Sequence, residues 1–382
     1  MNFDLTEDQL RVRDAVREFA EKEIAPGTAA REKSGEFPKT ILEKLGAMGI
    51  MGMMVPEPYG GSGADCLSYV VAVEELARVC ASTAVIVSVN NSVFCYPVWK
   101  FGTEEQKTTI LTEAASGRAL GAYALTEPQS GSDAANQKTR ADRAGAGYIL
   151  NGAKAWITNA GEARWYLVMA MTEPSAGTRG ITAFLVSADD AGVRPGPPED
   201  KMGLRASKTG ALYLENVKVP ASRRLGEEGQ GFTIAMTTLD HSRIGIAAQG
   251  IGIGRACFEA AVEYARTRES FGKKLAEHEA VAFQIADMSV QLEAAKLLTY
   301  RAAVLSESPG VRFSKESSMA KVFATEAANA IAARAVQVFG GYGYSREYPV
   351  ERFYRDARVT TIYEGTSEIQ RMVISKNLLA GR

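Results

Sequence analysis

The residue best suited to chemistry in this sequence is Glu364, which precedes a predicted C-terminal helix. Its neighbours are the apolar and aromatic residues Ile362 and Tyr363 on one side and the conformationally permissive Gly365 on the other. Because apolar surroundings disfavour the charged form, they raise the pKa of a glutamate from about 4.3 towards neutrality. Such a carboxylate can remove a proton from carbon and retain it. The alternative interpretation is an ordinary surface acid in front of a helix.

Two segments in the middle of the chain have the residue types needed to hold a flat heterocycle. Tyr123–Pro128 ends a predicted strand, where backbone N–H groups and the Thr126 hydroxyl can hydrogen-bond a ring; Ser132 in the next loop can reach a phosphate or pantetheine chain. The period-two spacing of Trp156 and Thr158 places them on one strand face, so that an indole covers a ring while a hydroxyl meets its heteroatom. A capped polar loop and a buried core tryptophan are the alternatives.

Charged residues at two helix ends could meet an anionic ligand. Arg268 follows a long predicted helix at a turn, where a guanidinium can grip a diphosphate bidentately. Asp240 and Arg243 lie three residues apart and share one helix face. A solvated arginine and a local ion pair are the alternatives. The glycine clusters Gly250–Gly254 and Gly340–Gly343 lack the strand-turn-helix context of a dinucleotide site, which excludes a Rossmann fingerprint.

The composition bounds the class of protein. The chain has 382 residues, 46% of them hydrophobic and 23% charged, enough to bury more than one core. A net charge of −1 gives no overall attraction for nucleic acid or anionic membrane. The acidic N-terminal stretch and the lack of an apolar run of about 18 residues predict a soluble, cytoplasmic protein. Four dispersed cysteines and two histidines predict free buried thiols and no metal centre.

The elements that must position these residues follow a helix, strand, helix order. Residues 1–120 read as an all-α domain, with capping boxes at Thr6–Gln9 and Thr103–Gln106. Residues 121–231 form short β-branched and aromatic runs, in which Asn151-Gly152 predicts a hairpin turn. Residues 232–382 return to the helical period and predict a four-helix bundle. Its expected helices are Thr233–Arg266, Glu277–Ser306, Ser314–Val338 and one capped by Thr366 or Ser367. The fold class is therefore α+β, with a β barrel or sandwich between two helical domains.

The chain resembles the acyl-CoA dehydrogenase family, in particular its short-chain and short/branched-chain members. The motifs that carry the resemblance occur in the family's order over nearly the whole chain: Tyr123–Pro128, Gly131–Asp133, Trp156–Thr158, Asp240–Arg243, Arg268–Gly272, Gln337–Gly341 and the Glu364 run. The resemblance implies the family's three-part fold, FAD as cofactor, and α,β-dehydrogenation of a short or short/branched acyl-CoA to the trans-2-enoyl-CoA. Glu364 would then take the α-proton and the flavin N5 the β-hydride.

The resemblance also implies a set of binding residues. Those expected at the flavin ring and the rest of the same cofactor are Tyr123, Leu125, Thr126, Ser132, Trp156, Ile157, Thr158, Thr366, Ser367 and Glu368. Those expected to reach the FAD of a neighbouring subunit are Arg268, Phe271, Glu279, Gln337, Val338, Phe339, Gly340 and Gly341. Those expected to contact the substrate are Ser132, Asp240, Arg243, Tyr363 and Gly365.

Two positions bear on these roles. A second arrangement in the family takes its base from a glutamate immediately before the arginine of the Asp240–Arg243 motif; this chain has Ser242 there, so the base falls to Glu364. The family usually has glutamine where this chain has Glu279, and a carboxylate near a diphosphate is repulsive unless it is protonated or paired.

The resemblance further implies a homotetramer, built as a dimer of dimers, and an electron-transferring flavoprotein as electron acceptor. Two other functions stay open at this point. One is a related flavin oxidase or monooxygenase on the same fold, and the other is a catalytically silent homologue that acts as an assembly partner. The length and branching of the acyl chain do not follow from the sequence, because helix side chains of unknown facing build the pocket floor.

Overall fold

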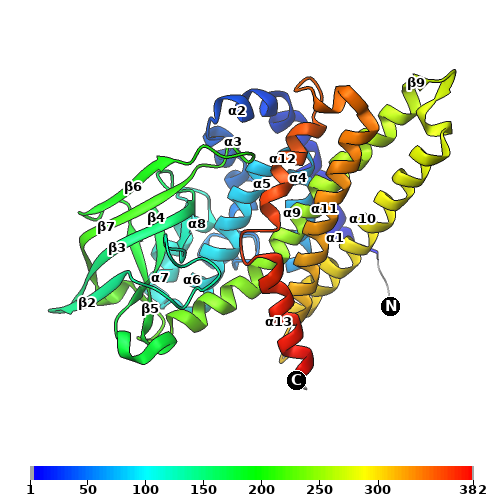
Figure 1. Ribbon diagram of the computed structural model, residues 1–382. Helices are drawn as coiled ribbons and strands as arrows, with labels where there is room; N and C mark the ends of the chain where they lie inside the picture. Colours follow the sequence, from blue (N-terminus) through cyan, green and yellow to red (C-terminus); the bar gives the residue numbers. More distant parts are fainter. Residues whose placement is uncertain (1–3, 381–382) are drawn as a thin grey trace.

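A sheet and a body of long helices lie side by side in the computed structural model of the chain, which describes residues 4–380 (Figure 1). The polypeptide begins in the helical body, leaves it for the sheet and then returns to it. This order of helices, strands and helices is the α+β layout expected from the sequence.

Short helices make up the first part of the chain. They are α1 (Glu7–Phe19), α2 (Thr28–Ser34), α3 (Lys39–Ala47), α4 (Cys66–Val79), α5 (Ala81–Ser88), α6 (Tyr96–Phe101), α7 (Glu104–Gln106) and α8 (Thr112–Ala115). Both predicted capping boxes are present: the side chain of Thr6 accepts a hydrogen bond from the backbone N–H of Gln9, and that of Thr103 from Gln106. These caps satisfy N–H groups that lack a partner within the helix, and so fix where α1 and α7 begin.

A mixed sheet forms the middle of the chain. Its strands are β1 (Gly121–Ala124), β2 (Arg140–Ala144), β3 (Gly147–Thr158), β4 (Trp165–Met171), β5 (Ile181–Ser187), β6 (Val193–Pro198), β7 (Thr209–Pro220) and β8 (Arg224–Leu225). They run in the order β6-β7-β3-β2-β4-β5-β8, and β1 pairs in parallel with β4. Every residue of β4 and β5 is buried, so this pair lies at the centre of the domain.

The hairpin predicted at Asn151-Gly152 is wrong. β3 continues through both residues, and the chain reverses instead at Gly145, between β2 and β3. The side-chain oxygen of Asn151 accepts a hydrogen bond from the backbone N–H of Asn216 (2.7 Å), across the strand pair. A Cβ atom on Gly152 would lie 2.5 Å from Thr139 Oγ1. Glycine is therefore needed there for close approach of two strands and not for a turn.

Long helices complete the body. They are α9 (Gly231–Thr267), α10 (Glu279–Ser306), α11 (Ser314–Phe339), α12 (Val350–Thr360) and α13 (Ser367–Leu379), with the small hairpin β9 (Glu269–Ser270) and β10 (Lys273–Lys274) between α9 and α10. The predicted long helices agree with α9, α10, α11 and α13, whereas α12 was not predicted. Thr366 is the N-cap of α13, and its side chain accepts a hydrogen bond from the backbone N–H of Ile369.

The helix α9 is the axis of the molecule. Its 37 residues span about 55 Å at the usual rise per residue. It begins beside β4 and β5 and ends at the β9–β10 hairpin on the opposite side of the molecule (Figure 1). A Cβ atom on Gly252 would lie 2.4 Å from the carbonyl oxygen of Glu74 in α4. The glycine cluster of residues 250–254 thus lets two helices pack closely, consistent with its exclusion as a nucleotide site.

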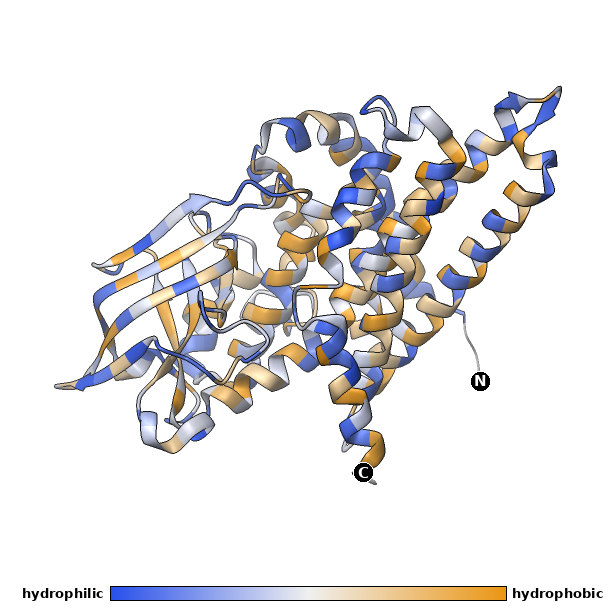
Figure 2. Ribbon diagram, in the orientation of Figure 1, coloured by the Kyte–Doolittle hydropathy of each residue, from blue (hydrophilic) through white to orange (hydrophobic). Residues whose placement is uncertain are grey.

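One apolar core joins the N-terminal helices to the long C-terminal helices. It combines buried residues of the N-terminal helices, such as Val16 and Leu76, with residues of α9 and α11, such as Ile244 and Ala320. Figure 2 shows the hydrophobic residues concentrated in the central helices. The four cysteines are buried and free, as predicted. Among the helices described between residues 4 and 380, none is long and apolar enough to cross a membrane.

Candidate active site

Glu364 lies in the turn between α12 and α13 with a left-handed backbone, at φ 52°, and Gly365 follows at φ 93°. A residue with a side chain costs of order 1–3 kcal/mol in this region and persists only where its surroundings enforce it. At φ 93° the backbone of Gly365 has a conformation that residues with a side chain rarely adopt, so the position favours glycine. The backbone strain thus falls on the residue that the sequence singled out for chemistry.

Buried polar side chains from three helices hold this turn. Gln370 in α13 donates from Nε2 to the carbonyl oxygens of Glu364 (3.2 Å) and Gly365 (2.9 Å). Lys321 in α11 donates from Nζ to the carbonyl oxygen of Gly365 (2.8 Å). The hydroxyl of Tyr363 hydrogen-bonds Oε1 of Gln249 in α9. The sequence reasoning missed Lys321, Gln370 and Gln249, although Lys321 and Gln249 are polar residues in largely apolar helical segments.

The Glu364 carboxyl has the environment of a base. Its Oε2 atom is buried and, within residues 4–380, has no hydrogen-bond partner. Burial raises the pKa of Glu364 to about 7, against the opposing effects of the Ser242 hydroxyl and of the positive charges of Lys321 and Arg243. The group is therefore about half ionised at neutral pH, where a general base works best.

Arg243 and Asp240 form the local ion pair that the sequence offered as the alternative to a ligand contact. Nη1 of Arg243 donates to Oδ1 of Asp240 (2.5 Å) and to Oγ of Ser318 (3.3 Å). The hydroxyl of Ser314 hydrogen-bonds the other oxygen of Asp240. Arg243 is only 4% exposed, and burial lowers its pKa while the charges of Asp240 and Glu364 oppose that change. The structure therefore brings this guanidinium into the interior near Glu364, and Asp240 nearer to solvent.

The two middle segments predicted to hold a ring lie next to each other. The backbone N–H of Ala155 donates to the carbonyl oxygen of Thr126 (2.9 Å), which joins the loop after β1 to the end of β3. Lys154, fully buried, donates to the carbonyl oxygen of Leu125 (3.2 Å) and to Oε1 of Glu127 (2.8 Å). The loop that carries Leu125 and Thr126 is thus fixed against β3.

Trp156 has a conformation that suits a bound ring. It sits at a β-bulge with φ 60°, and its side chain is 62% exposed, whereas Ile157 is buried and Thr158 half-buried. The buried hydroxyl of Tyr123 is close enough to Glu364 to feel its charge and has no hydrogen-bond partner in the described part of the chain. The exposed indole of Trp156 and the unpaired hydroxyl of Tyr123 are the kinds of contact that suit the isoalloxazine ring of FAD, which has an apolar face and a polar edge.

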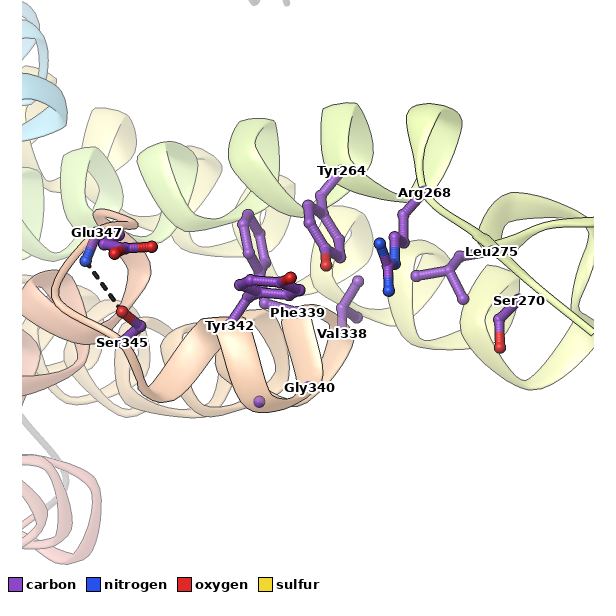
Figure 3. Close-up of a pocket in the computed structure, with 11 residues that line it drawn as sticks. Tyr264, Arg268, Ser270, Leu275, Val338, Phe339, Gly340, Tyr342, Ser345 and Glu347 are labelled. Atoms are coloured by element: carbon purple, nitrogen blue, oxygen red, sulfur yellow. Dashed lines mark hydrogen bonds between the residues drawn. The ribbon is translucent and has the colours of Figure 1, made fainter.

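A second group of predicted residues lies at the far end of α9. Here a pocket of about 550 Å³ lies between the end of α9 and the turn after α11 (Figure 3). Its lining includes Arg268, Val338, Phe339, Gly340 and Gly341. The guanidinium of Arg268 lies 5.6 Å from the ring centroid of Tyr342. Predicted residues therefore form two groups: Glu364 faces Ser242 and Arg243 in the first half of α9, and Arg268 follows 25 residues after Arg243, about 38 Å further along the helix.

Phe271 forms the tip of the β9–β10 hairpin beside this pocket. It has a φ of 51° and is 94% exposed. A bulky residue with this backbone and this exposure is an outlier that points to function. Glu279 is exposed at the first position of α10, where the helix dipole favours a carboxylate. Gln337 is also exposed.

The last predicted residues are spread over loops and a helix start. Ser132 is exposed in the loop that follows Glu127. At the beginning of α13, Glu368 is exposed, while the Oγ atom of Ser367 is buried without a hydrogen-bond partner among the described residues. A buried hydroxyl that is left unpaired is available to a ligand.

Family models match the chain in three successive parts. The N-terminal domain of acyl-CoA dehydrogenases matches residues 6–118, the middle domain residues 122–217 and the C-terminal domain residues 229–379. The acyl-CoA dehydrogenase of Bacillus subtilis (strain 168) is 49% identical over 377 residues, which cover 99% of each chain.

Solved structures of other proteins share the fold of this chain. Butyryl-CoA dehydrogenase from Megasphaera elsdenii superposes with a TM-score of 0.97 at 46% identity, over 99% of this chain and 100% of that one. A chain in the structure of the electron transferring flavoprotein of Acidaminococcus fermentans gives 0.98 at 46% identity, over 99% and 100%. Glutaryl-CoA dehydrogenase from Mycobacterium smegmatis in complex with FADH2 gives 0.93 at 33% identity, over 99% and 96%. The expected resemblance and fold are thereby confirmed: the chain belongs to the acyl-CoA dehydrogenase family.

Proposed function

We propose that the chain catalyses the FAD-dependent α,β-dehydrogenation of a short-chain acyl-CoA, with Glu364 as the base. The observation that carries this proposal is the Glu364 carboxyl itself: its Oε2 atom is buried and lacks a partner within the described residues, and its pKa is raised to about 7. Membership of the family supports the reaction class, and the similarity to butyryl-CoA dehydrogenase supports a short acyl chain.

In this proposal the residues of the chain perform three tasks. Thr126, Trp156 and Thr158 hold the flavin ring, and bound FAD supplies the acceptor for the hydride that leaves the β-carbon. Glu364 takes the α-proton, so that a C–H bond breaks and an O–H bond forms on the carboxyl group. The backbone N–H of Glu364 donates to the thioester carbonyl and acidifies the α-carbon, as the family resemblance implies.

The turn and its supports serve this chemistry by fixing the carboxylate before the substrate arrives. Pre-organisation matters because proton abstraction requires the two reacting atoms to stand within about 3.5 Å. Asp240 and Arg243 contact the CoA ester in this proposal, with Tyr363 and Gly365 shaping the site around the acyl group. The position of Arg243 next to Glu364 supports a contact near the reacting end of the ester.

Two copies of the chain complete each cofactor site in our proposal. Arg268 lies 25 residues beyond Arg243, about 38 Å along α9, which supports a role for the group around Arg268 and Phe271 at the FAD of a neighbour and not at the ring beside Glu364 of the same chain. A second observation supports assembly: α10 exposes apolar residues at seven-residue intervals, the spacing of a helix–helix seam. These residues are Phe283, Val290, Leu297 and Val304. The assembly is a homotetramer, built as a dimer of dimers.

An electron-transferring flavoprotein accepts the electrons in this proposal, in line with the match to a chain in the structure of the Acidaminococcus fermentans protein. The rival function is an oxidase or monooxygenase that uses oxygen directly. Anaerobic mixing with butyryl-CoA is expected to bleach the flavin absorbance, with slow recovery in air and fast recovery with the flavoprotein. Fast recovery in air alone would favour the rival.

The variant Glu364→Gln tests the base. Acid and amide are nearly isosteric, so the variant is expected to remain folded, yellow and able to bind acyl-CoA, yet unable to reduce its flavin. Flavin absorbance after anaerobic addition of butyryl-CoA is the measurement. Substantial reduction by the variant would show that another group removes the proton.

A further inference from the structure

Lys321 is an unusual residue for the interior of a helical body. Its side chain is completely buried in α11, and its ammonium group donates to the carbonyl oxygen of Gly365 at 2.8 Å. Transfer of an ammonium ion into a protein interior costs several kcal/mol unless opposite charge or hydrogen bonds compensate it. Since an apolar side chain of similar length would fill the same space without that cost, the charge itself calls for an explanation.

The ionisable groups around Lys321 identify Glu364 as the group with which its charge interacts most strongly. Burial lowers the pKa of Lys321 to about 8, and the largest opposing effect is the charge of Glu364, ahead of the smaller effects of Glu326 and Glu368. Seen from Glu364, the groups facing the carboxyl from each packed element are Tyr69 of α4, Tyr123 of β1, Ser242 and Arg243 of α9, Lys321 of α11 and Tyr363 of the same turn. Two of these are cations.

Arg243 is already committed to a carboxylate, because its guanidinium pairs with Asp240. Lys321 donates to a carbonyl oxygen, which leaves its full positive charge uncompensated by any ion pair within 4 Å in the described part of the chain. Lys321 is therefore the cation whose field acts on Glu364 without a closer anion to cancel it.

We propose that Lys321 is a positioning residue for the base: it holds the Glu364 turn through the Gly365 carbonyl, and its charge favours the ionised form of Glu364. The proposal rests on the role of Glu364 as base. The two contributions are separable, because Gln370 binds the same carbonyl oxygen from α13 (2.9 Å). Loss of Lys321 thus leaves one donor on the turn but removes the charge.

The test is the pH dependence of kcat/KM for butyryl-CoA in Lys321→Met, a variant of similar length without charge. The acid limb of this profile is the pH range in which kcat/KM falls as Glu364 becomes protonated. Because an opposite charge nearby shifts a carboxyl pKa by about 1 unit or more, the acid limb is expected to move to higher pH by about 1 unit in the variant. Activity at pH 6 then falls about tenfold relative to the parent, whereas the two proteins converge within a few-fold at pH 9. Lys321→Arg, which keeps the charge, is expected to keep the acid limb of the parent.

The matched control is Arg371→Met. Arg371 also links α13 to α11, through two hydrogen bonds to Glu326 (2.6 and 2.7 Å), but it is exposed and is not among the groups that act on the Glu364 carboxyl. Its removal is expected to leave the acid limb in place. A purely structural role for Lys321 would lower the thermal midpoint and kcat in Lys321→Met without moving the limb, and that result would overturn the proposal.

Two further arms keep the outcome decisive. Should Lys321→Met fail to fold, Lys321→Gln, which is uncharged and polar, carries the same expectation of a limb about 1 unit higher. Glu364→Gln is measured alongside. If it retains activity, the proposed base is wrong. If it is inactive and the acid limb does not move in Lys321→Met or Lys321→Gln, only the role of Lys321 is rejected.

Discussion

The raised pKa of Glu364 makes the activity of this protein sensitive to pH in the neutral range. A base works only when ionised, and kcat/KM reports the ionisation of the free enzyme. With a pKa of about 7, the ionised fraction falls from about 90% at pH 8 to about 10% at pH 6. A glutamate with the ordinary value of 4.5 would still be about 97% ionised at pH 6. We therefore expect kcat/KM to drop about tenfold between pH 8 and pH 6.

The assay is the initial rate of flavin-dependent turnover at low butyryl-CoA concentration, with an artificial acceptor whose own chemistry does not vary with pH. Parallel measurements of retained FAD at each pH separate loss of ionisation from loss of cofactor. A rate that stays level from pH 8 to pH 6 in fully loaded protein would refute the reasoning, because the carboxyl would then have an ordinary pKa despite its burial.

Other perturbations test the stability of the site and its ligand contacts. The variant Glu364→Gln is expected to be more stable than the parent at pH 8, by at most about 3 kcal/mol in the free energy of unfolding. Because folding raises the pKa of the Glu364 carboxyl, the free energy of unfolding of the parent falls as pH rises from about 4.5 to 7. Thermal midpoints of both ligand-free proteins across this range measure the gain, which should vanish near pH 4.5. Arg243→Ala is expected to weaken binding of an enoyl-CoA without loss of FAD, and an unchanged affinity would count against its role. Arg268→Ala should lose FAD and the oligomer together, as seen by FAD retention on dilution and by light-scattering mass. Glu279→Gln should retain FAD at least as tightly as the parent, and with a shallower loss as pH rises; faster loss would mean that this carboxylate accepts a favourable hydrogen bond.

The helical parts of the fold follow closely from local patterns. Side-chain caps mark the starts of α1 and α13, whereas α9, α10 and α11 begin without a side-chain cap and follow from their 3.6-residue period. α12 escaped prediction although Val350, Phe353 and Ala357 lie on one buried face. These positions are spaced i, i+3 and i+7, so the helical pattern was present in the sequence, but it lies in a short segment rich in charged residues and was missed.

The strands were harder to predict because side-chain patterns do not fix pairing. Asn151-Gly152 is a strong hairpin pattern, yet the tight contact of Gly152 with Thr139, the residue before β2, decides its conformation. The same limit applies to the site. The sequence led to Glu364 through its own neighbours, whereas Lys321 lies 43 positions earlier and meets the turn only because α11 packs against α13. No local pattern carries that information.

The length of α9 has a genetic consequence. If one helix carries Arg243 for its own site and leads to Arg268 for a neighbour's site, then a subunit with a defect in its own site can still supply an intact Arg268 to the neighbour, and the reverse also holds. Subunits with Glu364→Gln and subunits with Arg268→Ala would each be inactive alone. When the two are refolded together, a mixed pair contains one site that takes its base from the second subunit and its arginine from the first. Two defective alleles would thus restore part of the activity that neither possesses.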